Sequence, residues 1–238
     1  SDHYLPLGNN SKTSKKPISY IVAISDKIDT LVGFFLINEK PTSSKDPFAL
    51  RRSAIGLLRT IIDNKLNLKL RNLISYNIKL LEEQGVAKTN ENSENEILSF
   101  LKERMKNILK DKNIKNDIIE ASISSYFSDN YFDLYKKNTL MNKYINKEAG
   151  INAISSYKRA FNIVESAKEN LSGRPDAVLF RKDEEKHLFE KLNEIRKSFT
   201  VNEQDKDYEK LLLSLSEVKI FTDKFFDNVI VNLSLIHI

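Results

Sequence analysis

The chain has 238 residues, 40% of them hydrophobic and 30% charged, so it can bury the core of one or two domains. It has no cysteine, which excludes disulfides, thiolate zinc sites and a cysteine nucleophile. With 38 basic and 33 acidic residues the net charge is +5, which is compatible with RNA binding but does not require it.

The first third of the chain predicts three helices. Residues 1–16 are polar and loop-like, and Pro17 begins the first helix. After a loop at 38–46, the segment KDPFALRR (45–52) predicts a second helix that Asp46 caps and Pro47 begins. Its apolar face is made of Leu50, Ala54, Leu57, Leu58, Ile61 and Ile62. A third helix is predicted over 68–83, ending at Gly85.

The middle of the chain begins with a polar, aperiodic stretch at 86–95, the best candidate for a linker. The helix predicted after it has an apolar face of Ile97, Leu98, Leu101, Met105, Ile108 and Leu109. A shorter helix is predicted over 113–127. An aromatic cluster follows, made of Tyr126, Phe127, Tyr131, Phe132 and Tyr135. Beside Lys136 and Lys137 these rings can stack on bases, although a packed core between helices is the preferred interpretation.

The last third predicts helices over about 148–170, 183–199 and 205–229. In the first of them, the apolar residues Ile154, Tyr157, Phe161 and Val164 are expected to point inward. Lys158, Arg159 and Asn162 are then expected to share the outward face. The chain as a whole is predicted to be all-α.

Six side chains are candidates for contact with RNA: Lys158, Arg159, Asn162, Arg51, Arg52 and Arg59. Cations bind phosphate, and an amide can read the edge of a base. For the first three, the alternative is an ordinary solvated helix face. For the three arginines of the second helix, the alternative is an intramolecular clamp on Asp26, Asp29 or Asp46.

The sequence offers no catalytic residue and no metal site. The six glycines are scattered, so no glycine-rich phosphate loop is formed. His3, His187 and His237 lie far apart, and none has a metal-ligand neighbour at helical spacing. Asp26 and Asp29 share a helix face, where a surface role or a salt bridge with Lys27, Arg51 or Arg52 is favoured over metal binding.

A membrane location is not expected. The longest apolar run, residues 31–37, is far shorter than the ~20 residues of a membrane-spanning helix. The N-terminus also lacks a signal-peptide pattern. We therefore expect a cytoplasmic protein.

Several ordered segments resemble one protein family, the beta subunit of the bacterial tetrameric glycyl-tRNA synthetase. The segments GFF (33–35), KPT (40–42) and KDPFALRR (45–52) carry the most specific part of this resemblance. HYLP (3–6) and SDKIDTL (25–31) precede them, the latter similar to the family's ADKLDTL. KRAFNI (158–163) and FFDNV (225–229) follow, similar to KRVxNI and FFDxVMV.

The resemblance implies a C-terminal fragment of that subunit with three parts. Residues 1–85 resemble the C-terminal part of an HD-like domain, 86–135 form a helical linker region, and 136–238 resemble a DALR-type anticodon-binding domain. The apolar tail at 233–238 departs from the family pattern and is not interpreted.

The function implied is recognition of tRNA(Gly) within glycine–tRNA ligase. In this family the alpha subunit holds ATP, Mg and glycine, so this chain is expected to bind no cofactor and to carry no complete active site. An α2β2 heterotetramer is implied. Two alternatives remain open: a fragment of an HD-type metal-dependent phosphohydrolase, and a helical protein-interaction module without tRNA preference.

Overall fold

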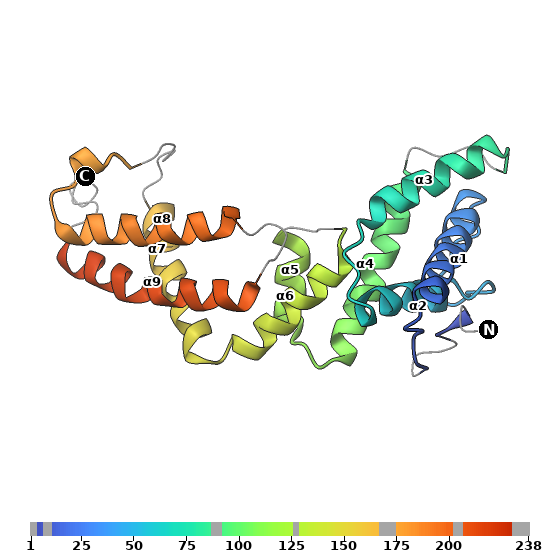
Figure 1. Cartoon of the computed structure of the whole chain (residues 1–238), viewed down its shortest axis with the longest axis horizontal. Helices are drawn as coiled ribbons and strands as arrows, with labels where there is room; N and C mark the ends of the chain where they lie inside the picture. Colours follow the sequence, from blue (N-terminus) through green and yellow to red (C-terminus); the bar gives the residue numbers. More distant parts are fainter. Residues whose placement is uncertain are drawn as a thin grey trace. The chain divides into compact units, whose positions relative to one another are not determined.

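A computed structural model describes residues 4–6, 11–86, 92–125, 129–166, 175–201 and 207–229 (Figure 1). Within these ranges every regular element is a helix, which confirms the predicted all-α class. The helices are α1 (Pro17–Leu36), α2 (Leu50–Asp63), α3 (Leu70–Glu83), α4 (Ser93–Asp111), α5 (Asn116–Ser125), α6 (Tyr131–Tyr144), α7 (Glu148–Ser166), the short 3-10 helix η2 (Ala177–Leu179), α8 (Asp183–Val201) and α9 (Tyr208–Asn228).

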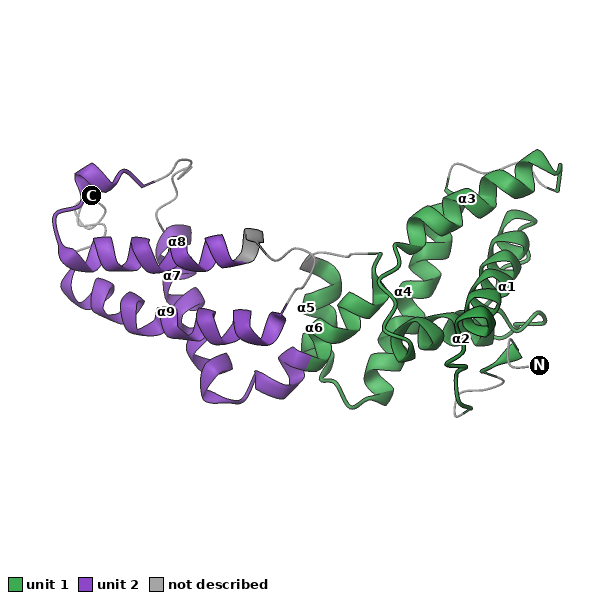
Figure 2. Ribbon diagram, viewed as in Figure 1, with its two compact units in different colours: residues 1–139 green, residues 140–238 purple. Residues whose placement is uncertain are grey.

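The chain forms two compact units, residues 1–139 and 140–238 (Figure 2). The division falls within α6. The three predicted parts, 1–85, 86–135 and 136–238, and their HD-like and DALR-type character stay predictions. Residues 87–91 of the predicted linker, Tyr126 and Phe127 of the aromatic cluster, and the tail 233–238 lie outside the described residues.

Unit 1 is built around α1, α2 and α4, each of which packs against the other two, with α3 against α1 and α4. The predicted apolar faces of α2 and α4 are confirmed, because all twelve residues named for them are buried. Tyr131 of the aromatic cluster is also fully buried, and its hydroxyl donates to the Leu98 carbonyl at 3.3 Å. This ring therefore belongs to the core and is not available for stacking on bases.

The start of α2 differs from the prediction. The helix begins at Leu50 and not at Pro47, because Ala49 has a left-handed backbone (φ 54°) that interrupts the helical path. Asp46 still caps the helix: its two carboxylate oxygens accept from the backbone N–H groups of Leu50 (2.8 Å) and Arg51 (3.0 Å). Phe48, inside the intervening turn, stacks on Phe34 of α1 with ring centroids 4.1 Å apart.

Asp46→Ala is expected to lower the free energy of unfolding of unit 1 by about 0.5–2 kcal/mol, because two N–H groups at the start of α2 lose their acceptor. Denaturant titration followed by circular dichroism measures this change. Glu39→Ala is the matched control, since it removes an exposed carboxylate from the same loop that accepts no hydrogen bond from the described residues. Equal effects of the two substitutions would contradict the capping role.

Unit 2 has α9 packed against both α7 and α8. Its described core is small: Ile195 and Val218 are its buried apolar side chains. Helices α7 and α9 also meet through two buried hydroxyls, since Thr222 Oγ1 donates to Ser156 Oγ at 3.3 Å. A polar contact thus lies where the apolar pattern predicts a hydrophobic one.

The predicted orientation of α7 is wrong. The four residues expected to point inward are exposed, with fractions of 36% for Ile154, 66% for Tyr157, 45% for Phe161 and 54% for Val164. The helix instead turns the face of Ser156 toward α9. Polar contacts of Ser156 and Arg159 with α9 accompany this orientation, and the apolar pattern along α7 does not indicate them.

Candidate RNA-binding surfaces

The six predicted contact residues divide between the two units. Arg51, Arg52 and Arg59 lie on α2 in unit 1, whereas Lys158, Arg159 and Asn162 lie on α7 in unit 2. Each group is therefore considered by itself.

The arginines of α2 differ in how they are held. Arg51 donates from its guanidinium to the Thr42 carbonyl, and Arg59 donates to the Ser11 carbonyl at 2.7 Å. Both contacts are to backbone oxygens and not to the carboxylates considered above. Arg52 is exposed, and its guanidinium has no hydrogen bond or ion pair with the described residues. Arg52 is thus the arginine of α2 best placed to bind an external phosphate.

A further cation of unit 1, Arg104 on α4, was missed by sequence reasoning. Its guanidinium lies over the ring of Phe100, 4.3 Å from the centroid, and Phe100 packs edge-on against Phe35 at 5.3 Å. Burial lowers the pKa of Arg104, and the positive charge of Arg51 lowers it further. The one signal in the sequence is the spacing of four residues between Phe100 and Arg104, which puts them on one face of a helix.

The acidic pair of α1 forms no metal centre with its neighbours. Asp26 and Asp29 are both exposed, and Asp29 accepts a hydrogen bond from the side-chain amide of Asn77 at 3.3 Å. Lys27 between them is buried, and this burial lowers its pKa against the opposing effect of Asp26. Among the residues that the structure describes, no three His, Cys, Asp or Glu side chains are grouped to hold a metal ion.

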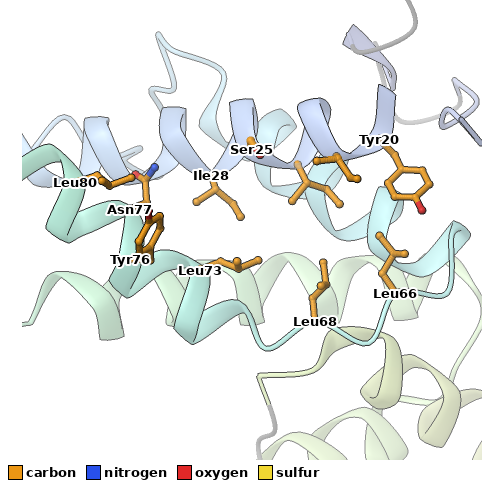
Figure 3. Close-up of a pocket in the computed structure, with 11 residues that line it drawn as sticks. Tyr20, Ser25, Ile28, Leu66, Leu68, Leu73, Tyr76, Asn77 and Leu80 are labelled. Carbon is orange, nitrogen blue, oxygen red and sulfur yellow. The ribbon is translucent and has the colours of Figure 1, made fainter. Parts of the chain in front are cut away.

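An apolar cleft of about 600 Å³ lies between α1 and α3 in unit 1 (Figure 3). Ile28 of α1 faces Leu73 of α3 across it, and Tyr20 of α1 lies opposite Leu66. Asn77 Oδ1 is buried beside it without a hydrogen-bond partner among the described residues. The lining carries no acid–base pair or nucleophile suited to catalysis.

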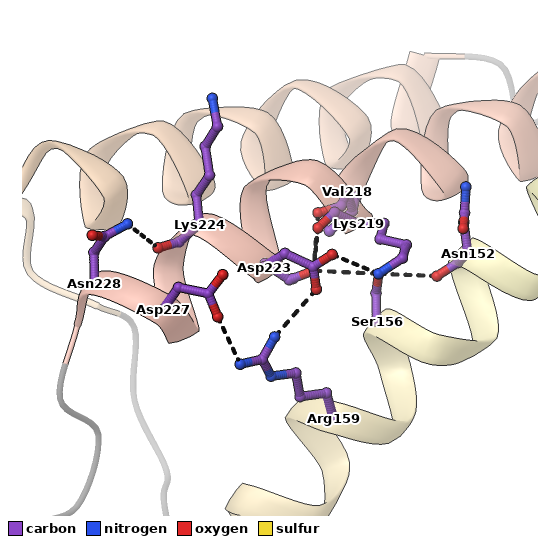
Figure 4. A network of polar contacts seen from close by, with 10 residues as sticks. Asn152, Ser156, Arg159, Val218, Lys219, Asp223, Lys224, Asp227 and Asn228 are labelled. Carbon is purple, nitrogen blue, oxygen red and sulfur yellow. Dashed lines mark hydrogen bonds and ion pairs between the residues drawn. The ribbon is translucent and has the colours of Figure 1, made fainter.

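Arg159 of α7 is held inside unit 2 by two carboxylates of α9 (Figure 4). Its guanidinium nitrogens lie 3.2 Å from Asp223 Oδ1 and 3.2 Å from Asp227 Oδ1. The guanidinium also lies over the ring of Phe226, 4.8 Å from the centroid. A hydrogen bond from Lys219 lowers the pKa of Asp223, and the charge of Arg159 adds to this effect. The two carboxylates thus hold Arg159 in a contact between α7 and α9.

All three predicted contact residues of α7 are exposed, as expected, but the carboxylates of α9 hold Arg159 and not Lys158 and Asn162. Both are exposed, and their side chains form no hydrogen bond or ion pair with the described part of the chain. Around the helix axis Arg159 lies about 100° from Lys158 and about 60° from Asn162, so the three side chains share a broad face whose Arg159 edge meets α9. The FFD block is half-buried at Phe225 and Phe226 and exposed at Asp227, so it borders the small core of unit 2.

No described helix is both long and apolar enough to cross a membrane.

Comparison with known proteins gives consistent matches. A family model described as "Glycyl-tRNA synthetase beta subunit" matches residues 1–124. The glycine–tRNA ligase beta subunit of Rickettsia africae is 37% identical over 231 residues, which cover 97% of this chain and 33% of the relative. The corresponding subunit of Rhodospirillum centenum is 35% identical over 237 residues, or 98% of this chain and 33% of the relative. The chain spans about a third of the length of these relatives.

The helical fold and these matches define a part of an aminoacyl-tRNA synthetase subunit. More particularly, the chain belongs to the glycyl-tRNA synthetase beta subunit family. The resemblance carried by the KDPFALRR, SDKIDTL, KRAFNI and FFDNV segments is thereby confirmed. The identity reaches α7 and α9, beyond the residues that the family model matches.

Proposed function

We propose that this chain is a tRNA-binding part of the beta subunit of glycine–tRNA ligase, which recognises tRNA(Gly) for ATP-dependent glycylation. The observation that carries this proposal is the similarity to ligase beta subunits over 97% of the chain. The positive net charge and the exposed cations Arg52 and Lys158 support it, because phosphate contacts supply much of the affinity for RNA.

Catalysis belongs, in this proposal, to the alpha subunit. That partner binds ATP, Mg and glycine, while this chain binds no cofactor and supplies no catalytic residue. The two subunits assemble as an α2β2 heterotetramer in the cytoplasm. The phosphohydrolase alternative finds no support in the relatives named above, which are ligase beta subunits.

The anticodon is the part of the tRNA that unit 2 would read. Glycine codons begin with two guanines, so every glycine anticodon ends in two cytosines. Lys158 and Asn162 are exposed side by side on α7, where they combine a cation for phosphate with an amide for a base edge. Arg159 contributes differently, because its clamp to Asp223 and Asp227 positions α7 on α9.

Binding of the 238-residue chain to glycine tRNA tests the proposal. The comparison is the same tRNA with its two anticodon cytosines replaced, each at two salt concentrations. We expect each replaced base to weaken binding by about 1–3 kcal/mol, by analogy with mismatch costs in nucleic-acid sites. Equal, salt-sensitive binding of both tRNAs would leave only a nonspecific basic surface and would refute anticodon recognition.

Two lysine variants sharpen this experiment. Lys158→Ala is expected to weaken binding of both tRNAs alike and to reduce the salt slope by about one, as the loss of one phosphate contact does. Lys224→Ala is the matched control, since Lys224 is an exposed lysine of the same unit that points away from Arg159 in Figure 4. If Lys158→Ala and Lys224→Ala change the affinity and the salt slope equally, Lys158 is not a specific phosphate contact.

A further inference from the structure

Two aromatic rings on α7 are open to solvent and stacked on each other. Tyr157 is 66% exposed and Phe161 is 45% exposed. Their ring centroids are 5.7 Å apart, and their planes differ by 26°. Contiguous exposed apolar surface is typical of interaction sites, and these two rings lie together on one helix.

This pair is not part of the helix contact within unit 2. Helix α7 meets α9 through Ser156, which bonds with Thr222, and through Arg159, which pairs with two aspartates. Tyr157 and Phe161 lie one turn apart on another side of the same helix. The packing of α7 on α9 therefore leaves both rings on the outer side of the helix.

The polar residues beside the rings favour RNA as the occupant. Lys158 and Asn162 each follow one ring in the sequence and are exposed, without a hydrogen bond or ion pair to the described residues. The ammonium can bind phosphate while the rings stack on bases. Glu165, one turn beyond Phe161, would repel phosphate, so the RNA backbone is expected to run along the side of Lys158 and Asn162.

We propose that Tyr157 and Phe161 form a stacking platform for unpaired bases, with Lys158 and Asn162 holding the adjoining backbone and base edges. The proposal rests on the RNA-binding function above and adds the chemical means by which unit 2 would hold a single-stranded loop. Every base has a flat π-face, so stacking on the rings accepts any base. The platform therefore supplies affinity for an unpaired loop, and the Asn162 amide supplies selectivity among bases.

The exposed aliphatic neighbours Ile151, Ile154 and Val164 extend the same side of α7. They are compatible with the alternative, a protein helix covering this surface. RNA is favoured over such a partner because Lys158 and Asn162 border the rings and offer a cation for phosphate and an amide for base edges. The two occupants can be told apart by measurement. Stacking on RNA bases needs the aromatic rings themselves, whereas a protein helix needs only apolar bulk at these positions.

The test uses the full 238-residue chain and an RNA hairpin with the anticodon stem and loop of glycine tRNA, carrying 2-aminopurine in the loop. The double variant Tyr157→Leu/Phe161→Leu keeps apolar bulk and removes both π-faces. We expect it to bind the hairpin about 5- to 150-fold more weakly than the unsubstituted chain and to lose the quenching of 2-aminopurine. Phe161→Tyr, which keeps a ring, should retain both the affinity and the quenching.

Tyr76→Leu is the matched control, because Tyr76 is a 63% exposed tyrosine of unit 1. It should leave binding unchanged, and circular dichroism should be the same for every variant. If the unsubstituted chain binds the hairpin and the double variant binds it equally well, the platform is refuted while the RNA-binding function stands. A double variant with normal RNA binding but altered sedimentation would identify a protein-docking face and also refute the platform.

Two further outcomes separate this inference from the proposed function. If the unsubstituted chain binds no RNA, the proposed function fails and the platform fails with it. If the double variant loses binding to loops of any sequence, while the unsubstituted chain does not distinguish glycine tRNA from other tRNAs, the platform is supported and the specificity for glycine tRNA is refuted.

Discussion

Leu57→Ala is expected to lower the free energy of unfolding of unit 1 by about 2–5 kcal/mol, the range for leucine truncation in a packed core. Leu57 is 0% exposed and lies on α2, which packs against both α1 and α4. Alanine leaves a cavity at that position, and three packed helices can close it only in part. Loss of this core would also release the loop that carries the KDPFALRR segment, since that loop ends at the first residues of α2.

Native-state hydrogen exchange, measured by mass spectrometry on peptides from α2 and α4, reads this effect within unit 1. Leu213→Ala provides the comparison, because Leu213 on α9 is 43% exposed. We expect the Leu213 substitution to change stability by less than about 1 kcal/mol, as is usual for surface positions. Leu57→Ala should reduce the exchange protection of α2 more than Leu213→Ala does. If the two reductions are equal, the contact among α1, α2 and α4 is not the main core of unit 1.

Gly150→Ala is expected to destabilise unit 2 by about 1–3 kcal/mol, because the added methyl group has no room. A Cβ built on Gly150 would lie 2.2 Å from the Tyr144 carbonyl oxygen and 3.1 Å from Ile145 Cα. Both are backbone atoms, so no side-chain rotation can relieve the clash. The end of α6 and the first turn of α7 would have to separate.

Gly33→Ala is the matched control and should have the opposite sign. Gly33 lies within α1, and a Cβ built there meets no atom within 4 Å. Alanine at such a helical position is expected to stabilise unit 1 by about 0.5–1 kcal/mol. Thermal unfolding of both variants checks the pair of predictions. If the Gly150→Ala variant unfolds at the same temperature as the unsubstituted chain or at a higher one, the end of α6 and the start of α7 are free to move apart.

Much of unit 1 could be predicted from the sequence because its helices repeat apolar residues at helical spacing. Those on α2, from Leu50 to Ile62, and on α4, from Ile97 to Leu109, are buried as expected. Each of these helices has one strongly apolar face and meets several neighbours, so only one orientation buries it. Asp46 was also identified correctly as a cap, because capping depends on residues close in the sequence.

The candidate surfaces were predicted less completely. Arg52, Lys158 and Asn162 are exposed, as a contact with RNA requires, whereas Arg159 is held by Asp223 and Asp227. The sequence distance from Arg159 to these aspartates gave no indication that α7 and α9 would meet there. Arg104 was missed for the same reason, since its closeness to Arg51 depends on the packing of α4 against α2.

The sequence by itself determined the helical class, the apolar faces of α2 and α4, and membership of the glycyl-tRNA synthetase beta subunit family. The tertiary structure alone decided that α2 starts after Ala49, and that α7 presents Ser156 and Arg159 to α9 while Tyr157 and Phe161 face solvent. The physical reason is that helical periodicity fixes which side chains share a face. Which face is covered depends on the shape and charge of helices far away in the chain.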